Sequence, residues 1–316
     1  MDAPVNGMGL ARLFWETHRA ELFAGELEPY AARAAAGLVG EGSECWGYDD
    51  EISRDHDWGP GCCIWLTRDD HAAVGAELQR RYDEVAARPL AGFPPRPPAN
   101  PGAGKRVGVF RVEAFYTRFL HDGMPRDLDA WRRAPEHALA AATNGEVFFD
   151  GAGRFSQIRA NILAYYPEDL RLHRIASACV HGAQDGQYNL GRQLARGEDL
   201  AAMAALSRFQ DDACRIAYAL ARRFMPFYKW RARALADLGE TGRAVRTGLD
   251  RALAAFRAGD AGACTGAVED VCRTLVAELR AQGLTDSDDP WLLEQAGRVN
   301  ARVADDALRA ADLMQP

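Results

Sequence analysis

The pattern of apolar residues changes near residue 122, and this change limits the fold more than any other feature of the sequence. Before it, residues 61–67 form a continuous apolar run rich in β-formers, and residues 106–115 alternate between two faces. Both patterns predict strands. After it, helical patterns follow one another, separated by Gly and Pro. We therefore predict an α+β chain with a small α/β domain over 1–122 and an all-helical bundle domain over 123–316.

Apolar residues at helical spacing predict an amphipathic helix over 10–23 and another helix over 69–87. Residues 30–39 are interpreted as a short helix that turns into a strand. Residues 146–150 interrupt the helical part as a short hairpin or arm, and Gly259 and Gly283 stand where helices commonly end. The helices predicted beyond residue 122 cover 127–142, 154–165, 168–184, 198–224, 227–238, 243–258, 261–282 and 290–313.

Residues 88–105 contain six of the prolines, at positions 89, 94, 95, 97, 98 and 101. Proline lacks a backbone N–H and fixes φ, so this density excludes regular structure. We predict an exposed loop, either a lid or a plain connector.

The composition is that of a globular protein, with 48% hydrophobic and 26% charged residues. No apolar run reaches the roughly 18 residues of a membrane span, and we expect a cytoplasmic protein without a membrane partner. A net charge of -7 argues against an extended nucleic acid as partner, because phosphate binding requires clustered Lys and Arg. The seven cysteines lack metal-ligand spacing, and we predict small buried apolar residues rather than a zinc site.

One motif indicates a metal-dependent phosphate-binding site. It is the turn Gly40-Glu41-Gly42-Ser43, which is followed after eleven residues by Asp55-His56-Asp57. On a strand, Asp55 and Asp57 would project to the same side, where a divalent cation such as Mg²⁺ would relieve their repulsion. The turn offers backbone N–H groups and the Ser43 hydroxyl to phosphate oxygens. Glu113, on the next predicted strand, is the candidate third carboxylate or general base.

Each of these residues also has a plainer interpretation. The motif can be an acidic surface loop, and Glu113 can be a strand-edge carboxylate paired with Arg111 or Arg118. The run Asp49-Asp50-Glu51 is interpreted as a solvated or loop-ordering charge cluster. Gln187-Tyr188-Asn189 either forms a turn or lines an acceptor pocket.

The Gly-x-Gly-Ser turn, its spacing to Asp55-x-Asp57 and the later acidic residue resemble the nucleotidyltransferase superfamily that includes DNA polymerase beta and the aminoglycoside nucleotidyltransferases. The longer string over residues 42–60, together with Pro226-Phe227-Tyr228-Lys229-Trp230, looks like an uncharacterised bacterial branch of it, the domain-of-unknown-function 4037 family. The resemblance covers about residues 9–240 and is strongest at 40–60. His56 departs from it, since that position is usually apolar in the superfamily.

The resemblance implies a mixed-sheet nucleotidyltransferase domain and transfer of a nucleoside monophosphate from an NTP, with ATP the expected donor, to a hydroxyl of a small molecule or protein. Two Mg²⁺ ions would serve as cofactors, and pyrophosphate would leave. The implied ligands of the metals are Asp55, Asp57 and Glu113, which are also the implied catalytic residues. The implied nucleotide contacts are Gly42, Ser43, Tyr228 and Lys229.

Three functions from different classes follow from this sequence. The first is the active transferase, and the second is a catalytically silent nucleotide-binding module, regulatory or antitoxin-like, on the same fold. The third is a helical interaction protein without nucleotide affinity. Retention of Ser43, Asp55, Asp57 and Glu113 favours the first. A homodimer is compatible with all three.

Overall fold

The computed structural model describes residues 6–97, 104–120 and 123–314, and the chain divides into two compact units. Unit 1 consists of Met1–Ala130 and Ala138–Ala164, and unit 2 of Trp131–His137 and Tyr165–Pro316. This division differs from the predicted domain boundary at residue 122. The segment 138–164 packs with the first unit because it carries a strand of the sheet.

Unit 1 contains a four-stranded mixed sheet with the strand order β3-β2-β1-β4. β1 pairs antiparallel with both β2 and β4, whereas β2 and β3 are parallel. The α+β class with a small mixed sheet is thus confirmed. The strands are β1 (Ala35–Leu38), β2 (Cys63–Leu66), β3 (Gly108–Arg111) and β4 (Glu146–Asp150).

The fourth strand corrects the prediction of a hairpin or arm over 146–150. β4 lies against β1, and its register shifts between Ala36 and Gly37. A Cβ placed on Gly37 would lie 2.3 Å from the backbone oxygen of Glu146. The two backbones therefore approach so closely because position 37 is glycine.

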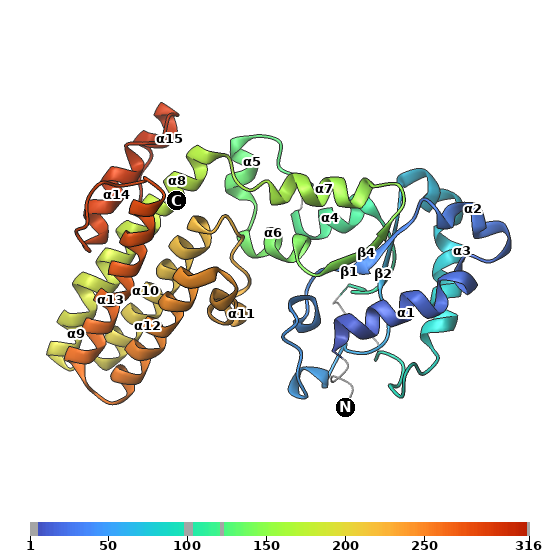
Figure 1. The fold of residues 1–316 in the computed structure, drawn as a ribbon, viewed down its shortest axis with the longest axis horizontal. Helices are drawn as coiled ribbons and strands as arrows, with labels where there is room; N and C mark the ends of the chain where they lie inside the picture. Colours follow the sequence, from blue (N-terminus) through green and yellow to red (C-terminus); the bar gives the residue numbers. More distant parts are fainter. Residues whose placement is uncertain (1–5, 98–103, 121–122, 315–316) are drawn as a thin grey trace. The chain divides into compact units, whose positions relative to one another are not determined.

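Helices cover both faces of this sheet (Figure 1). On one face, Phe14 of α1 (Gly7–Leu22) and Leu78 of α3 (Arg68–Ala86) join Ile64 in one apolar core. On the other face, Trp65 stacks on Phe155 of α7 (Arg154–Leu163), with ring centroids 3.8 Å apart. Burial on both faces explains why 61–67 is an uninterrupted apolar run.

The remaining helical segments of this part of the chain are short. They are the 3₁₀ turns Gly25–Leu27, Ser43–Trp46 and Ile52–Arg54, and the helices α2 (Glu28–Ala31), α4 (Val112–Leu120), α5 (Leu128–Arg133) and α6 (Glu136–Thr143).

Two predictions about these elements are wrong. The strand predicted over 106–115 ends at Arg111, and Val112 begins α4, so the alternation reflects a strand for only four residues. The helix predicted over 127–142 is divided by Pro135, which disfavours the helical conformation of the preceding residue. The proline-rich loop forms an isolated bridge between Leu90 and Phe93 and then runs without regular structure to residue 97. Its lid or connector role stays a prediction, and 98–103 lie outside the described residues.

Unit 2 is helical, and Figure 1 shows α10, α12 and α13 packed side by side within it. The predicted helix over 290–313 is two helices, because a turn at 301–302 and irregular backbone over 303–305 separate them. Gly259 and Gly283 follow α12 and α13 with φ of 70° and 68°, as predicted for helix ends. The elements are α8 (Glu168–Gly182), a π-helix (Ala183–Leu190), α9 (Gly191–Arg196), α10 (Asp199–Leu220), α11 (Tyr228–Ala234), a 3₁₀ turn (Leu235–Asp237), α12 (Gly239–Arg257), α13 (Ala261–Ala281), α14 (Leu292–Asn300) and α15 (Asp306–Ala310).

All seven cysteines are buried and free, which confirms their interpretation as buried small residues. Within the described ranges, none of the helices combines the length and the apolarity that crossing a membrane would demand.

Candidate functional site

The turn after β1 has a backbone that only glycine adopts readily. Gly40 and Gly42 have φ of 130° and 143°. The buried Asn144 side chain clamps the turn: it accepts a 2.9 Å hydrogen bond from Gly40 N and donates a 2.8 Å bond to Gly40 O. The conformation of the turn is thus set by a side chain 104 residues further along the chain.

Gly42 also needs to be glycine for steric reasons. A Cβ at this position would lie 1.7 Å from Nη2 of Arg106 and 2.6 Å from Oε2 of Glu44. Ser43, which is buried, then begins the 3₁₀ turn that ends at Trp46. The predicted phosphate-binding turn is therefore in direct contact with a guanidinium group.

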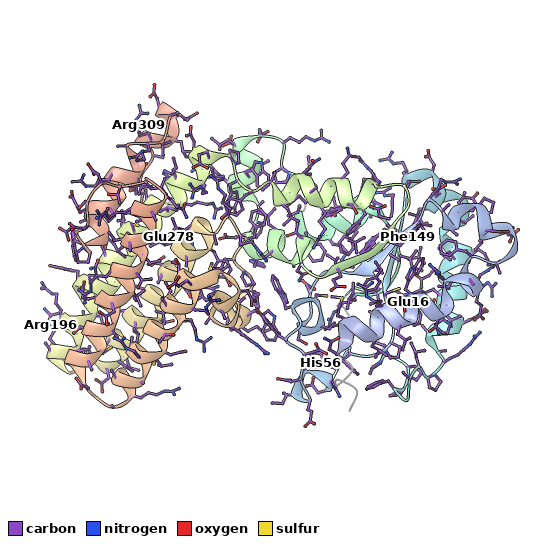
Figure 2. All side chains as sticks on the ribbon, viewed as in Figure 1. Glu16, His56, Phe149, Arg196, Glu278 and Arg309 are labelled. Carbon is purple, nitrogen blue, oxygen red and sulfur yellow. The ribbon has the colours of Figure 1, made fainter. Side chains whose placement is uncertain are left out.

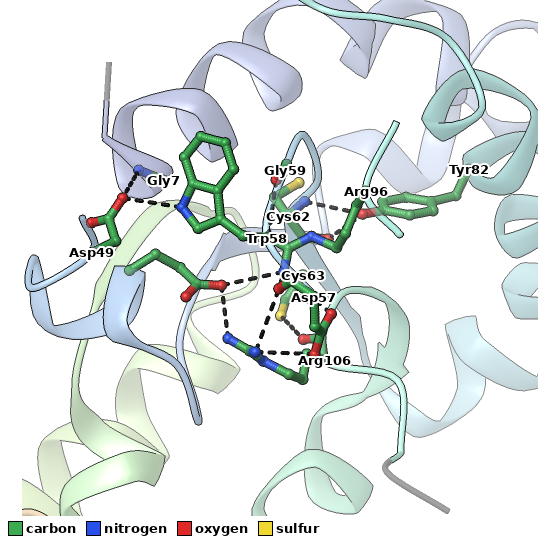
Figure 3. Close-up of polar contacts among 11 residues, drawn as sticks. Gly7, Asp49, Asp57, Trp58, Gly59, Cys62, Cys63, Tyr82, Arg96 and Arg106 are labelled. Carbon is green, nitrogen blue, oxygen red and sulfur yellow. Dashed lines mark hydrogen bonds and ion pairs between the residues drawn. The ribbon is translucent and has the colours of Figure 1, made fainter. Parts of the chain in front are cut away.

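Four charged side chains meet beside this turn, and we call them the arginine cluster (Figure 3). Arg106 donates to Glu44 Oε1 at 2.8 Å and to Asp57 Oδ2 at 3.0 Å. Arg96 donates to Glu44 Oε1 at 3.2 Å and lies 3.6 Å from Asp57 Oδ1. The Glu44 side chain is only 3% exposed, so its charge depends on these two guanidinium groups for compensation.

The arginine cluster also holds the backbone of the loop. Arg96 donates to the carbonyl oxygens of Asp57 and Gly59, at 2.7 and 3.0 Å. Burial lowers the pKa of Arg106, but the charges of Glu44 and Asp57 outweigh burial and keep this pKa above its usual value. Arg106 therefore remains a cation at any accessible pH.

The predicted strand carrying Asp55 and Asp57 is absent from the described loop. Asp55 follows the 3₁₀ turn Ile52–Arg54 with helical dihedrals, Asp57 has φ of 48°, and β2 begins only at Cys63. The expectation that both carboxylates project from one strand is therefore wrong. Positive φ at Gly59 and Gly61 and the missing N–H of Pro60 keep this stretch out of the ladder.

The two aspartates consequently have different surroundings. The Asp55 side chain is 66% exposed and lies 2.5 Å from His56 Nδ1, whereas the Asp57 side chain is 12% exposed and belongs to the arginine cluster. Figure 2 shows His56 at the outer end of the loop. The structure thus places Arg106 next to both Gly42 and Asp57, with Ser43 following Gly42 in the turn, and it leaves Asp55 at the surface.

Glu113 is not on a strand either. It lies in the first turn of α4, where the helix dipole favours a carboxylate. Its Oε1 is 3.4 Å from Arg154, while its buried Oε2 has no hydrogen-bond partner among the described residues. The ion-pair partner of Glu113 is therefore Arg154 and not Arg111 or Arg118, the two partners considered from the sequence.

The residues of this site do not fit a pair of magnesium ions in the described arrangement. Over the ranges that the structure covers, no three His, Cys, Asp or Glu side chains gather closely enough to hold a metal ion. The Asp57 carboxylate already accepts a charged hydrogen bond from Arg106, and Asp55 points to solvent.

Tyr228 and Lys229 belong to unit 2 and begin α11. The Tyr228 side chain is exposed and its ring packs on Phe227 with centroids 4.6 Å apart. The Lys229 ammonium lies 5.1 Å from the centroid of the Trp230 ring. Their role in nucleotide binding stays a prediction.

The acidic run before Asp55 orders the loop, in agreement with one of its two plainer interpretations. Asp49 Oδ2 accepts hydrogen bonds from Gly7 N at 2.7 Å and from Trp58 Nε1 at 3.1 Å (Figure 3). Asp50 Oδ1 accepts from Ser53 N at 2.9 Å. The Asp49 contact with Gly7 ties the loop to the start of α1, and the Asp50 contact closes a turn within the loop.

Sequence reasoning missed Glu44, Arg96, Arg106 and Asn144 as site residues. Arg96 stands among prolines and Arg106 stands just before a strand, so neither has a periodic or motif signal. Glu44 lies within the string 42–60, but nothing in the sequence distinguishes it from the neighbouring acidic residues. The one available hint is Gly42, because an obligatory glycine implies that another group approaches closely.

Comparison with known families bears on a different part of the chain. Residues 131–231 match the family model described as Domain of unknown function (DUF4037). The predicted resemblance to that family is confirmed, whereas the match includes none of the residues of the Gly40–Ser43 turn or of the Asp55–Asp57 motif. Neither the curated proteins nor the solved structures include a match to the chain.

Proposed function

We propose that this protein binds the phosphates of a nucleotide at the Gly40–Ser43 turn and transfers a nucleoside monophosphate from an NTP to a hydroxyl group. The observation that carries the proposal is the contact between Gly42 and Arg106. A glycine turn that leaves room for a guanidinium group suits an anion with several oxygens, and the fork of arginine matches phosphate geometry.

Arg96, the second buried cation beside the turn, also supports phosphate binding. Arg96 and Arg106 both pair with Glu44 and Asp57, so the arginine cluster is neutral without a ligand. A triphosphate would compete with the two carboxylates for the guanidinium groups. Asp57 would then be released from Arg106, which is the change that any catalytic role of this carboxylate requires.

The proposed reaction follows from the resemblance. The acceptor hydroxyl oxygen attacks the α-phosphorus, a new P–O bond forms, and the bond to the β-phosphate oxygen breaks. Pyrophosphate leaves, and the hydroxyl proton goes to a base. ATP is the expected donor, and a small molecule or a protein side chain is the expected acceptor.

A second candidate is a catalytically silent nucleotide-binding module. Two specific observations favour it: the carboxylate of Asp57 is occupied by Arg106, and Asp55 is directed to solvent. Both candidates require phosphate binding at the same turn, and they differ only in turnover.

Nucleotide binding can be tested by thermal-shift and calorimetric titration of the four NTPs, with and without Mg²⁺. Arg106→Gln is expected to abolish the nucleotide effect, whereas the matched charge change Arg88→Gln, at an exposed ion pair with Glu21, is expected to preserve it. Since Arg106→Gln can impair folding, Ser43→Ala serves as a second variant and should weaken binding. Absence of any NTP effect on the wild type would leave the helical interaction protein as the explanation.

Turnover can be tested separately by pyrophosphate release and by the mass gain of an added acceptor or of the protein itself. The variant Asp55→Asn/Asp57→Asn is the control. Nucleotide binding without pyrophosphate release in any acceptor mixture would assign the silent module.

A further inference from the structure

Unit 2 contains a polar cavity of about 290 Å³ between α8, the π-helix and α10. Its lining includes the charged residues Glu136, Arg174, Asp185, Asp212 and Arg215. Every lining residue lies within the DUF4037 segment 131–231. The cavity is therefore a feature of the matched domain and does not involve the arginine cluster of unit 1.

The π-helix shapes this cavity. π-helical segments are rare and frequently occur at functional sites. Gly186 presses against the ring of Phe209 in α10, where a Cβ would lie 2.2 Å from a ring carbon. Because the π-helix is held so close to α10, its residue Asp185 borders the same space as Asp212.

Two lining side chains have polar atoms without a partner. Tyr165 is only 5% exposed, and its hydroxyl has no hydrogen-bond partner among the described residues. The same holds for the buried Nε2 of His181. A buried polar group without a partner costs free energy, so such groups in a cavity indicate that a ligand satisfies them.

The backbone and packing of Tyr165 fix its position. Its φ of 79° is unusual for an aromatic residue. Its ring packs on those of Tyr166 and Phe224, with centroid distances of 4.7 and 4.9 Å. The hydroxyl is therefore held at the cavity by a rigid aromatic support.

Three carboxylate–arginine pairs of the cavity are too long for direct hydrogen bonds. The carboxylates are the more buried partners, with side chains 14%, 18% and 9% exposed, whereas the arginines are 26%, 72% and 47% exposed. The pairs are Glu136 with Arg174 at 3.8 Å, Asp185 with Arg208 at 4.0 Å, and Asp212 with Arg215 at 4.0 Å.

We propose that this cavity binds a small, neutral, polyhydroxylated molecule, that is, a sugar or a sugar alcohol. A hydroxyl group donates to a carboxylate and accepts from a guanidinium at the same time, so it can bridge each of these pairs. A neutral ligand also adds no net charge to a lining in which acidic and basic groups are interleaved. An amine would face three arginines, and an anion would face the buried carboxylates.

The inference can be tested on the full-length chain by calorimetry and saturation-transfer NMR. The probes are D-glucose, D-galactose, D-mannose, D-ribose, D-sorbitol and myo-inositol, with ethanolamine and inorganic phosphate as charged comparators. At pH 8, where Asp212 is ionised, at least one polyol is expected to bind, and Asp212→Asn should weaken that binding about tenfold, as expected when a hydrogen bond to a charged group is lost.

Two further variants make the test specific. Tyr165→Phe removes only the hydroxyl and should also weaken polyol binding, while Asp288→Asn, an equal charge change on the exposed surface of unit 2, should not. Circular dichroism establishes that each variant is folded. The proposal is overturned if no polyol binds, if ethanolamine or phosphate binds more tightly than every polyol, or if the Asp212 and Tyr165 variants bind as the wild type does. Each outcome is independent of nucleotide binding, because the probes contain no nucleotide and the variants lie in unit 2.

Discussion

Arg106 donates a 3.0 Å hydrogen bond to the carboxylate of Asp57, a residue 49 positions earlier in the chain. This bond changes what the Asp55-His56-Asp57 motif can do chemically. Without it, Asp55 and Asp57 would be two repelling carboxylates that need a metal ion. With it, Asp57 is a compensated charge next to the Gly42 turn, and Asp55 is a surface residue.

Gly42→Ala is expected to lower the free energy of unfolding by about 2–4 kcal/mol, because the new Cβ would overlap with Arg106 at a positive φ. The matched control is Gly47→Ala in the same loop. Gly47 also has positive φ, but no atom lies within 4 Å of its Cβ position, so the expected loss is only about 1 kcal/mol. Urea unfolding measures both values. Equal losses would show that Arg106 does not occupy this space.

Arg106→Met is expected to cost about 3–5 kcal/mol, since it leaves the buried Glu44 carboxylate with Arg96 alone. Adding Glu44→Gln to this variant should recover part of the loss, because the uncompensated charge is then removed. The double-mutant cycle is measured by chemical denaturation at neutral pH. Strict additivity of the two single effects would contradict the ion pair.

Asn144→Ala is expected to destabilise the fold by about 2–4 kcal/mol, because both the N–H and the carbonyl of Gly40 lose a buried partner. The comparison is Asn161→Ala on the exposed side of α7, where alanine should be neutral or slightly stabilising. Amide hydrogen exchange should also report faster exchange at Gly40. Unchanged protection there would rule out the clamp.

Asp212→Asn is expected to stabilise the protein at pH 8 and to have little effect near pH 4. The pKa of Asp212 is raised from 3.8 to about 7: burial is the largest cause, Arg215 opposes it, and the charges of Asp185 and Asp211 add to it. Between these two values the folded state binds more protons than the unfolded state. The contribution of Asp212 to stability is therefore lost as pH rises from about 4 to 7, by on the order of 2–4 kcal/mol.

The measurement for this prediction is urea unfolding of the wild type and Asp212→Asn at several pH values from 4 to 8. Asp288→Asn provides the comparison, since an exposed carboxylate should give a difference that does not vary over this range. A difference between wild type and Asp212→Asn that is constant with pH would refute the raised pKa.

Several elements could be predicted because their signal is local. The apolar run that becomes β2, the amphipathic pattern of α1 and the glycines after α12 and α13 each act within a few neighbouring residues. The strand predicted over 106–115 is wrong beyond Arg111, because residues 112–120 also fit a helical face and the packing of Phe115 on Trp65 selects the helix.

The sequence by itself determined the α+β class, the helical character of unit 2, the glycine turn after β1 and the resemblance to the DUF4037 family. Only the tertiary structure decided that β4 pairs with β1, that Asn144 clamps Gly40, and that Arg106 separates Asp57 from Asp55. The physical reason is that the residues in these contacts lie far apart in the sequence. Hydrogen bonds and ion pairs between residues such as Arg106 and Glu44, 62 positions apart, depend on how the chain folds back, and no local pattern records that path.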